Sequence, residues 1–203
     1  MAIKYSPSVN IIRDSNRDLG YIPTPNAERI AKLIASNFSD GLRSFTLIGS
    51  YGTGKSSFLW AISQTILGKK RFFDLGFDNY TAVEALNMVG EFSPVSDYFA
   101  NYFGVEDSKK IDFTQHIFSE IYNRYHGLGK GNRLLLLLID EFGKFLEYAA
   151  RHEPEKELYF LQQLAEFVNN SDHNILLITS LHQNFDAYAS KLNEPQRNEW
   201  TKV

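Results

Sequence analysis

The chain has 203 residues, enough for one domain or for one domain with a short extension. Charged residues make up 22% and hydrophobic residues 43%, which is typical of a globular chain and excludes disorder. There is no cysteine, which excludes a disulfide framework, a thiolate nucleophile and a cysteine-ligated zinc site. The formal charge of −3 argues against broad binding of nucleic acid by this segment, so we expect any such contact from other segments.

The sequence offers no segment that could span a membrane. Its longest aliphatic run, Leu134 to Ile139, is far shorter than the roughly 20 residues of a spanning helix. The first residues lack a continuous apolar stretch behind a basic start, so they do not form a secretion signal. We therefore expect no membrane contact and a cytoplasmic location.

The N-terminal part predicts an arm followed by a helix. Residues 1–25 are polar and contain several prolines, with one short β-like run at Val9–Ile12, and we interpret them as an arm. The remainder, residues 26–203, is then the main domain. Asn26 is expected to cap a helix over about 27–38, because the apolar residues of that stretch share one helical face.

A strand, a helix and a second strand come next. Residues 44–48 are bounded by glycines and read as a strand, and a helix is predicted from about 54 to 67. In the following stretch either 72–75 or 84–92 fits a strand, and we prefer 84–92 because it ends at a Ser-Pro turn.

The second half repeats the alternation of helix and strand. Asp112 and Gln115 form a capping box for a helix with apolar residues at four-residue spacing. Residues 134–139 fit a strand buried on both faces of a parallel sheet. A helix is predicted after Pro154 and a further buried strand over 175–179. This alternation predicts βαβ units and an α/β sandwich of three layers with a mainly parallel sheet.

A phosphate-binding loop is the strongest motif. Residues 49–56 (GSYGTGKS) match GxxxxGK[ST] between a predicted strand and a predicted helix. Its glycines let the backbone approach phosphates, and its amides converge at a helix N-terminus. Lys55 brings a positive charge toward the β- and γ-phosphates, and Ser56 offers a hydroxyl to magnesium. The nucleotide-binding residues predicted from this motif are Gly49, Ser50, Tyr51, Gly52, Thr53, Gly54, Lys55, Ser56 and Ser57.

An acidic pair follows the leucine-rich strand. Asp140 and Glu141 stand at its carboxyl end, the edge at which open α/β sheets bind ligands. Asp140 is predicted to orient a hydrated magnesium ion and Glu141 to polarise a water molecule for attack on the γ-phosphate. The alternative is that both residues only begin the next helix, where the helix dipole favours acidic side chains.

Together the two motifs resemble the Walker A and Walker B elements of the additional-strand P-loop ATPases, which include the AAA+ proteins. This resemblance implies a sheet ordered 5-1-4-3-2, ATP with Mg²⁺, and further domains or subunits that complete the site. It also implies that Lys55 and Glu141 act in catalysis, and that Thr179 or Ser180 is the polar sensor at the end of the next strand. Residues 21–23 fall where such proteins contact adenine, although they could equally serve packing.

Three short segments carry a second resemblance. Residues 139–147 (IDEFGKFLE), 179–183 (TSLHQ) and 196–200 (QRNEW) are similar to the ATPase segment of large bacterial proteins encoded among phage-defence systems.

Other classes lack their motifs here. No NKxD-like or LSGGQ-like segment is present, which excludes Ras-type GTPases and ABC ATPases. A small-molecule kinase stays open, but an acidic pair directly after the strand favours activation of water. Of the five histidines, only His182 lies near the predicted site.

The C-terminal residues are too few for a whole ATPase of this class. Residues 184–193 fit a helix, and no apolar strand follows, so the fifth strand and the helical lid have no sequence to occupy. Strand 44–48 would then be a sheet edge, exposed or covered by Val9–Ile12. We expect the front part of a longer ATPase, with Arg197 either an arginine finger or, as we prefer, a surface charge.

The sequence thus predicts Mg-dependent binding and hydrolysis of ATP by a P-loop ATPase domain. Two alternatives remain: a nucleotide-dependent switch or interaction module with little turnover, and an ATPase that moves DNA through contacts outside this segment.

Overall fold

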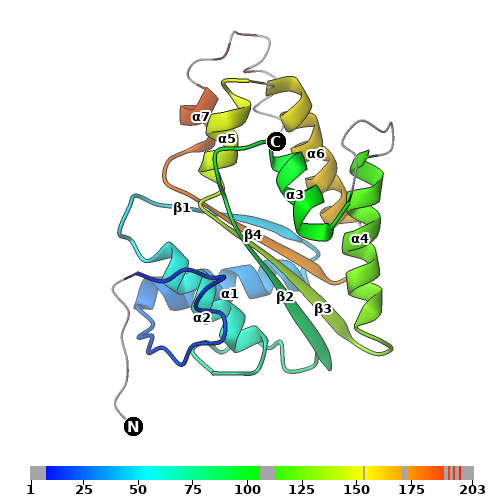
Figure 1. Ribbon diagram of the computed structural model, residues 1–203. Coiled ribbons are helices and arrows are strands. Elements are labelled where there is room, and N and C mark those ends of the chain that lie inside the picture. The colour runs from blue at the N-terminus through cyan, green and yellow to red at the C-terminus, as the bar shows by residue number, and fades with distance from the viewer. Residues whose placement is uncertain are drawn as a thin grey trace.

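The computed structural model describes residues 8–105, 113–152, 154–170 and 173–189, together with residues 192, 194 and 197. Its helices and strands are α1 (Pro25–Ser39), β1 (Ser44–Ile48), α2 (Lys55–Ile66), β2 (Ala82–Val89), α3 (Val95–Phe103), α4 (Phe113–Gly127), β3 (Arg133–Asp140), α5 (Gly143–Ala149), α6 (Pro154–Asn170), β4 (Ile175–Leu181) and α7 (Phe185–Tyr188) (Figure 1).

The four strands form one parallel sheet in the order β1-β4-β3-β2. This is the 1-4-3-2 part of the order expected from the Walker motifs, and the α/β prediction is confirmed. Within the described ranges the sheet has no fifth strand, so β1 pairs with β4 along one side only.

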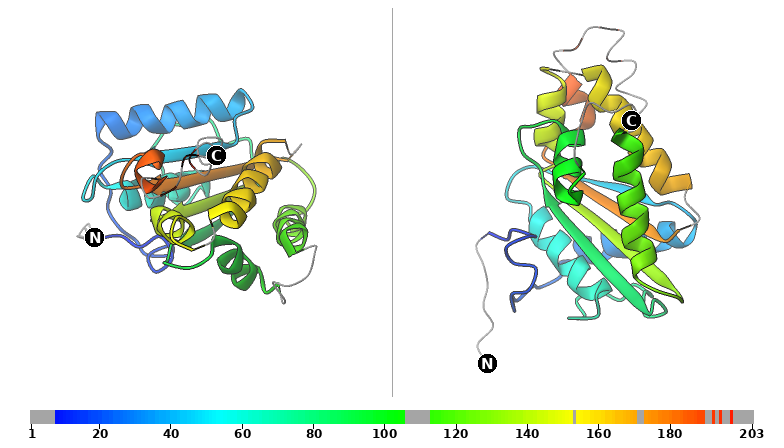
Figure 2. Two further views of the ribbon diagram at one scale, coloured as in Figure 1. Left: turned by 90° about the horizontal axis from the view of Figure 1, so that it is seen from above. Right: turned by 45° about the vertical axis from the view of Figure 1, so that its right-hand side comes forward.

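Helices cover both faces of the sheet and complete a three-layer sandwich (Figures 1 and 2). One apolar core joins α1, α2 and the N-terminal arm to one face, and a second joins α3 to α7 to the other. The leucine-rich strand β3 divides its side chains between these cores: Leu134, Leu136 and Leu138 face α2, and Leu135, Leu137 and Ile139 face α6. This alternation follows from the two-residue period of a strand.

Several predicted boundaries shift for local reasons. Helix α1 begins at Pro25 rather than after Asn26, because the Thr24 hydroxyl accepts the backbone N–H of Ala27 at 3.2 Å and proline suits the first helical position. Strand β2 spans Ala82–Val89, so the preference for the later of the two candidate stretches is confirmed with altered ends. Helices α3 and α5 were not predicted.

The run Val9–Ile12 is not a strand. It enters a turn in which the Asn10 side chain accepts the backbone N–H groups of Ile12 and Arg13. The side chain of Ile11 is buried in the core beneath α1 and α2. Ile11 and the adjoining Val9 therefore serve core packing, whereas Ile12 is exposed. The run does not pair with β1, so this one of the alternatives for the strand edge is not observed.

The arm is attached firmly to helix α2. The indole of Trp60 donates to the Asp14 carbonyl at 2.9 Å, and the amide of Gln64 donates to the Ser15 carbonyl at 3.0 Å. Asp14 itself has no solvent-exposed surface, and its carboxylate accepts hydrogen bonds from Arg13 and Arg17. These arginines hold the pKa of Asp14 well below its usual range.

Some predictions concern residues beyond those described. The capping residue Asp112 and most of the segment after Ala189 lie outside the described ranges. Arg197 is exposed, and its Nε donates to the Leu192 carbonyl at 3.0 Å.

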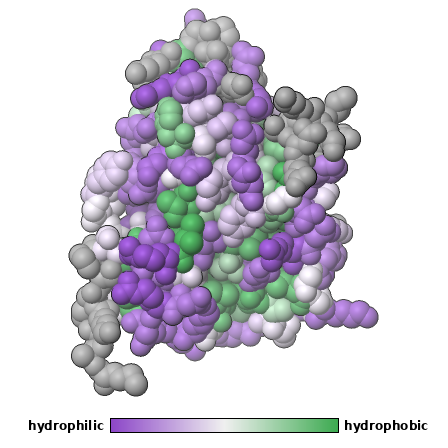
Figure 3. All heavy atoms as spheres, viewed as in Figure 1, coloured by the Kyte–Doolittle hydropathy of each residue, from purple (hydrophilic) through white to green (hydrophobic). Residues whose placement is uncertain are grey.

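The surface view in Figure 3 shows mostly hydrophilic residues, with hydrophobic residues gathered over the lower part of the sheet. None of the helices in the described ranges is long and apolar enough to cross a membrane.

Candidate functional site

The carboxyl ends of the strands are joined by backbone hydrogen bonds that bring three loops together. The Gly49 N–H donates to the Leu181 carbonyl at 3.1 Å, which ties the end of β1 to the end of β4. The Phe142 N–H donates to the Ser180 carbonyl at 3.0 Å, and the Gly90 N–H donates to the Asp140 carbonyl at 2.7 Å. The predicted site therefore lies at the edge where parallel α/β sheets bind their ligands.

The phosphate loop connects β1 to α2 and takes its shape from glycine. Gly52 and Gly54 have φ angles of 77° and 83°, a left-handed conformation that side chains rarely adopt. At Gly49 an added Cβ would lie 3.0 Å from the Thr53 hydroxyl, which itself donates to the Ser50 carbonyl. The loop is thus a compact turn that opens the N-terminus of α2, a ready site for an anion.

Lys55, the first residue of α2, turns back over the loop. Its ammonium donates to the carbonyls of Gly49 at 2.5 Å and Ser50 at 2.9 Å. Burial lowers its pKa, and the nearby carboxylates of Asp140 and Glu141 oppose that effect. The lysine of one motif and the acidic pair of the other therefore belong to the same charged cluster.

Asp140 closes β3 and bonds to the neighbouring strand. The Ser180 hydroxyl donates to Asp140 Oδ1 at 2.6 Å, and both side chains are buried. The register that pairs Ile139 with Thr179 places Asp140 beside Ser180. Strand alternation turns Thr179 to the opposite face, where its hydroxyl meets that of Thr46 at 2.9 Å. Of the two sensor candidates, Ser180 is therefore the one that contacts the acidic pair.

Glu141 has an unusual backbone conformation, with a φ of 52° in the left-handed region. Its N–H donates to both Asp140 Oδ1 and Ser180 Oγ at 3.0 Å, which compensates for the strain. Behind it stands Gly90, where a Cβ would come within 2.2 Å of the Glu141 carbonyl oxygen. The Glu141 carboxylate forms an ion pair with Lys144 in the first turn of α5.

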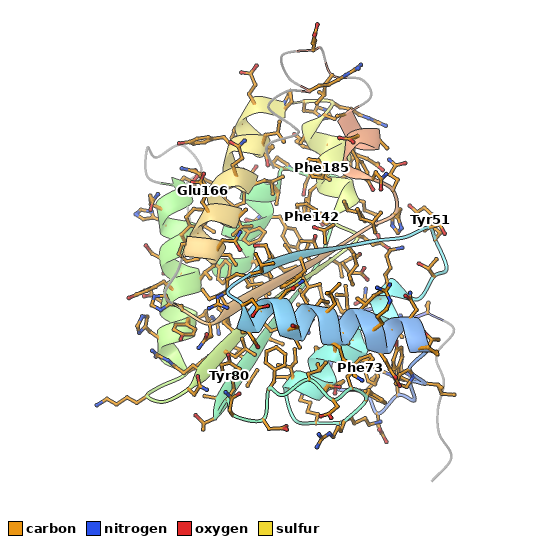
Figure 4. The ribbon with its side chains drawn as sticks, turned by 180° about the vertical axis from the view of Figure 1, so that it is seen from behind. Tyr51, Phe73, Tyr80, Phe142, Glu166 and Phe185 are labelled. Carbon is orange, nitrogen blue, oxygen red and sulfur yellow. The ribbon has the colours of Figure 1, made fainter. Side chains whose placement is uncertain are left out.

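His182 follows β4 and lies between the phosphate loop and α7. Its ring stacks on that of Tyr51, with ring centroids 3.6 Å apart and planes inclined by 20°. Burial lowers the pKa of His182, and the positive charge of Lys55 lowers it further. Figure 4 shows Tyr51 on the loop that leaves the end of β1.

A cavity of about 590 Å³ lies between α1 and β1 and adjoins the phosphate loop. Its lining includes Tyr21 and Ile22 as well as Gly54, Lys55 and Ser57. The segment predicted to contact adenine and the segment predicted to bind phosphate therefore border one continuous space. A nucleotide-sized pocket is typically 300–1,000 Å³.

The residues at this site suit a nucleoside triphosphate with magnesium. Loop amides and an ammonium group suit phosphate oxygens, and an apolar cavity suits a base. Ser56, the second residue of α2, and Asp140 supply the hydroxyl and carboxylate oxygens that a hard divalent cation prefers.

Sequence reasoning missed the residues that support the acidic pair. Gly90 lies against the Glu141 carbonyl, and Lys144 forms an ion pair with the Glu141 carboxylate. Neither residue was given a role from the sequence. Tyr188 was also missed: a Cβ at Gly143 would lie 2.2 Å from its hydroxyl. The alternation of side chains along β4 could have distinguished the two sensor candidates. Ser180 lies on the same face as Ile178, the face covered by α2.

The parallel sheet order β1-β4-β3-β2, with the loop between β1 and α2 and the acidic end of β3, matches a P-loop NTPase fold. No family model matches this sequence, and no curated protein sequence matches it.

Among solved structures, the fold is similar to the Aeropyrum pernix ORC2 protein in its ADPNP–ADP complexes. The TM-score is 0.54 at 16% identity, over 94% of this chain and 50% of that chain. PCH-2 of C. elegans gives a TM-score of 0.45 at 18% identity, over 86% of this chain and 38% of that one. Drosophila ORC bound to AT-rich DNA and Cdc6 gives 0.41 at 13% identity, over 89% and 59%.

Only the first of these similarities is close enough to support the fold, and at 16% identity it shows the fold alone. The chain spans about half the length of the ORC2 chain that it matches.

Proposed function

We propose that this chain binds Mg·ATP at the phosphate loop and that Glu141 activates a water molecule for its hydrolysis. The observation that supports this most directly is that hydrogen bonds join β4 to both motifs: the Gly49 N–H donates to the Leu181 carbonyl, and the Ser180 hydroxyl donates to Asp140. A cation beside a phosphate-binding loop and a carboxylate pair at the adjoining strand end are the two charges that phosphoryl transfer to water requires.

Each residue has a role that follows from its position. Loop amides and Lys55 would hold the phosphates, which would draw the ammonium away from the carbonyls of Gly49 and Ser50. Ser56 and Asp140 would hold the magnesium ion, which when bound neutralises charge between the β- and γ-phosphates. Ser180 fixes the Asp140 carboxylate, and the strained backbone of Glu141 aims its carboxylate separately.

The adenine ring of the nucleotide would occupy the cavity beside Tyr21 and Ile22. Apolar contacts there would bind the flat face of a purine, while the phosphates reach the phosphate loop. Further domains or subunits are expected to complete the site.

Binding is tested by Lys55→Ala, with the exposed Lys130→Ala as a control of equal charge change. We expect Lys55→Ala to abolish binding of ATP and ADP in calorimetric titration and Lys130→Ala to leave it unchanged. Micromolar affinity retained in Lys55→Ala would contradict the assignment of the phosphate loop.

Hydrolysis is tested by Glu141→Gln, with Glu147→Gln on the exposed side of α5 as its control. The amide keeps the shape of the side chain but cannot accept a proton from water, so turnover should fall by roughly 10²–10⁴. Nucleotide affinity should stay within about threefold. Parent-like turnover in Glu141→Gln would rule out Glu141 as the base.

A second candidate is a nucleotide-dependent switch with little turnover. The ion pair between Glu141 and Lys144 favours it, because the ammonium group occupies a carboxylate oxygen that would otherwise contact the attacking water. Steady-state turnover, measured with and without DNA, separates the two. A switch would bind ATP and ADP but show almost no turnover under either condition.

A further inference from the structure

The tip of the phosphate loop is held from outside the loop by an aromatic contact. Tyr51 stands at the tip with 76% of its surface exposed, and the flanking residues Ser50, Gly52 and Thr53 are exposed as well. The hydrogen bonds of Lys55 and Thr53 end on carbonyls within the loop itself, so they hold its base together. The stacking of Tyr51 on His182 instead joins the tip to the end of β4.

His182 is a rigid support for this contact. It directly follows Leu181, which is buried and accepts the backbone N–H of Gly49. The backbone N–H groups of His182 and Gln183 approach the Tyr188 hydroxyl, and the Tyr188 side chain is packed tightly against Gly143. The backbone of His182 is therefore held by Tyr188 of α7, which in turn packs against Gly143 of α5.

The imidazole nitrogens have no hydrogen-bond partner among the described residues, although both are shielded from solvent. Burial and the positive charge of Lys55 lower the pKa of His182, which favours the neutral form of the ring. A neutral ring stacks on a tyrosine without the desolvation of a full charge.

From this geometry we propose that His182 is a positioning residue for the phosphate loop: by stacking on Tyr51 it holds the loop tip in the conformation that receives the phosphates. The inference rests on the proposed function, because it concerns the affinity of the same nucleotide site. A loop with several glycines loses more conformational freedom on binding than a restrained one, so restraint before binding improves affinity.

The size of the effect follows from the strength of aromatic pairs. Such pairs contribute about 0.5–1.5 kcal/mol beyond their buried area, which corresponds to roughly 2- to 12-fold in a dissociation constant. We expect Tyr51→Ala and His182→Ala each to weaken ADP binding about 3- to 10-fold.

The affinity test uses calorimetric titration of Mg·ADP into the full chain. Besides the two alanine variants it includes their double variant and the aromatic replacement His182→Phe. The double variant should bind no more weakly than the poorer single variant, because one contact is lost in all three. The His182→Phe variant should stay within about twofold of the parent. Losses that multiply in the double variant would overturn the proposal, and so would a His182→Phe variant as weak as His182→Ala.

A second measurement does not depend on nucleotide. Hydrogen–deuterium exchange of a peptide covering residues 49–54 should be faster in His182→Ala than in the parent, and should return to the parent rate in His182→Phe. If the parent binds no nucleotide, the proposed function fails, but this exchange still tests the positioning role. Equal exchange in all three proteins would overturn it, and circular dichroism checks that each variant is folded.

Discussion

The two halves of the candidate site are built in different ways. The phosphate loop is a contiguous stretch whose glycines, lysine and serine lie within eight positions of sequence, and the stacking of His182 on Tyr51 supports its tip from outside. The acidic end of β3 depends instead on residues from other elements: Gly90 after β2, Lys144 in α5 and Ser180 in β4. A contiguous motif therefore locates a phosphate site, whereas the part that would perform the chemistry is fixed by the fold.

Among the changes that test this contrast, Gly90→Ala is expected to have the largest effect. A Cβ would lie 2.2 Å from the Glu141 carbonyl oxygen, and both groups are backbone-bound, so one strand end must move. We expect the free energy of unfolding to fall by about 2–3 kcal/mol and hydrolysis to fall more than nucleotide affinity. Urea denaturation and turnover measure the two effects. Gly127→Ala, where a Cβ meets nothing within 4 Å, is the matched control.

Asp14→Asn tests whether the loop half is as local as its motif suggests. The arm is bonded to α2, and loss of the buried carboxylate weakens its hydrogen bonds with Arg13 and Arg17. We expect a loss of roughly 1–2 kcal/mol at pH 7 with little change in nucleotide affinity. A tenfold loss of affinity would show that the loop depends on the arm as well as on its contact with His182.

The same variant has a pH signature. Because the folded pKa of Asp14 is lowered, its contribution is fully present above the ordinary aspartate pKa of about 3.9 and is lost as the pH falls through the folded value. The stability difference between the parent and Asp14→Asn should therefore shrink below about pH 4. Thermal unfolding between pH 3 and pH 7 measures it, and a constant difference would contradict the assignment.

Ser180→Ala and Thr179→Val together sharpen the comparison at the acidic half. Removing the Ser180 hydroxyl frees the Asp140 carboxylate, which should reduce hydrolysis about tenfold and stability by about 1 kcal/mol. Thr179 faces Thr46, so its replacement should leave hydrolysis within about twofold. The reverse order of effects in a turnover assay would restore Thr179 as the sensor.

The smallest effect is expected for Lys144→Gln. Both members of its ion pair with Glu141 are partly exposed, and such pairs contribute about 0–1 kcal/mol. Releasing the carboxylate should raise turnover by no more than about fivefold. A larger increase would mean that Lys144 restrains the chain as a switch.

The elements predicted best were those with a strong period or a motif. Residues 134–139 and 175–179 proved to be central strands, and the helix after Gly54 follows the loop as predicted. Helices α3 and α5 were missed because they are short and follow turns that carry no clear cap. The β-like run Val9–Ile12 was misread because apolar residues in a turn can be buried as deeply as those in a strand.

At the site, sequence spacing located Lys55, Asp140 and Glu141 but could not show which groups fix them. The pairing of Asp140 with Ser180 depends on the register of β3 against β4, which no local pattern states. Contacts such as that of Gly90 with Glu141 depend on the approach of two backbones, and only a three-dimensional structure shows them.

Strand β1 has one unpaired side within the described residues, and this strand runs directly into Gly49. An extended chain pairing with that side would form hydrogen bonds to the last residues before the phosphate loop. A change in the register of that chain would therefore act on the strand that carries the phosphate loop.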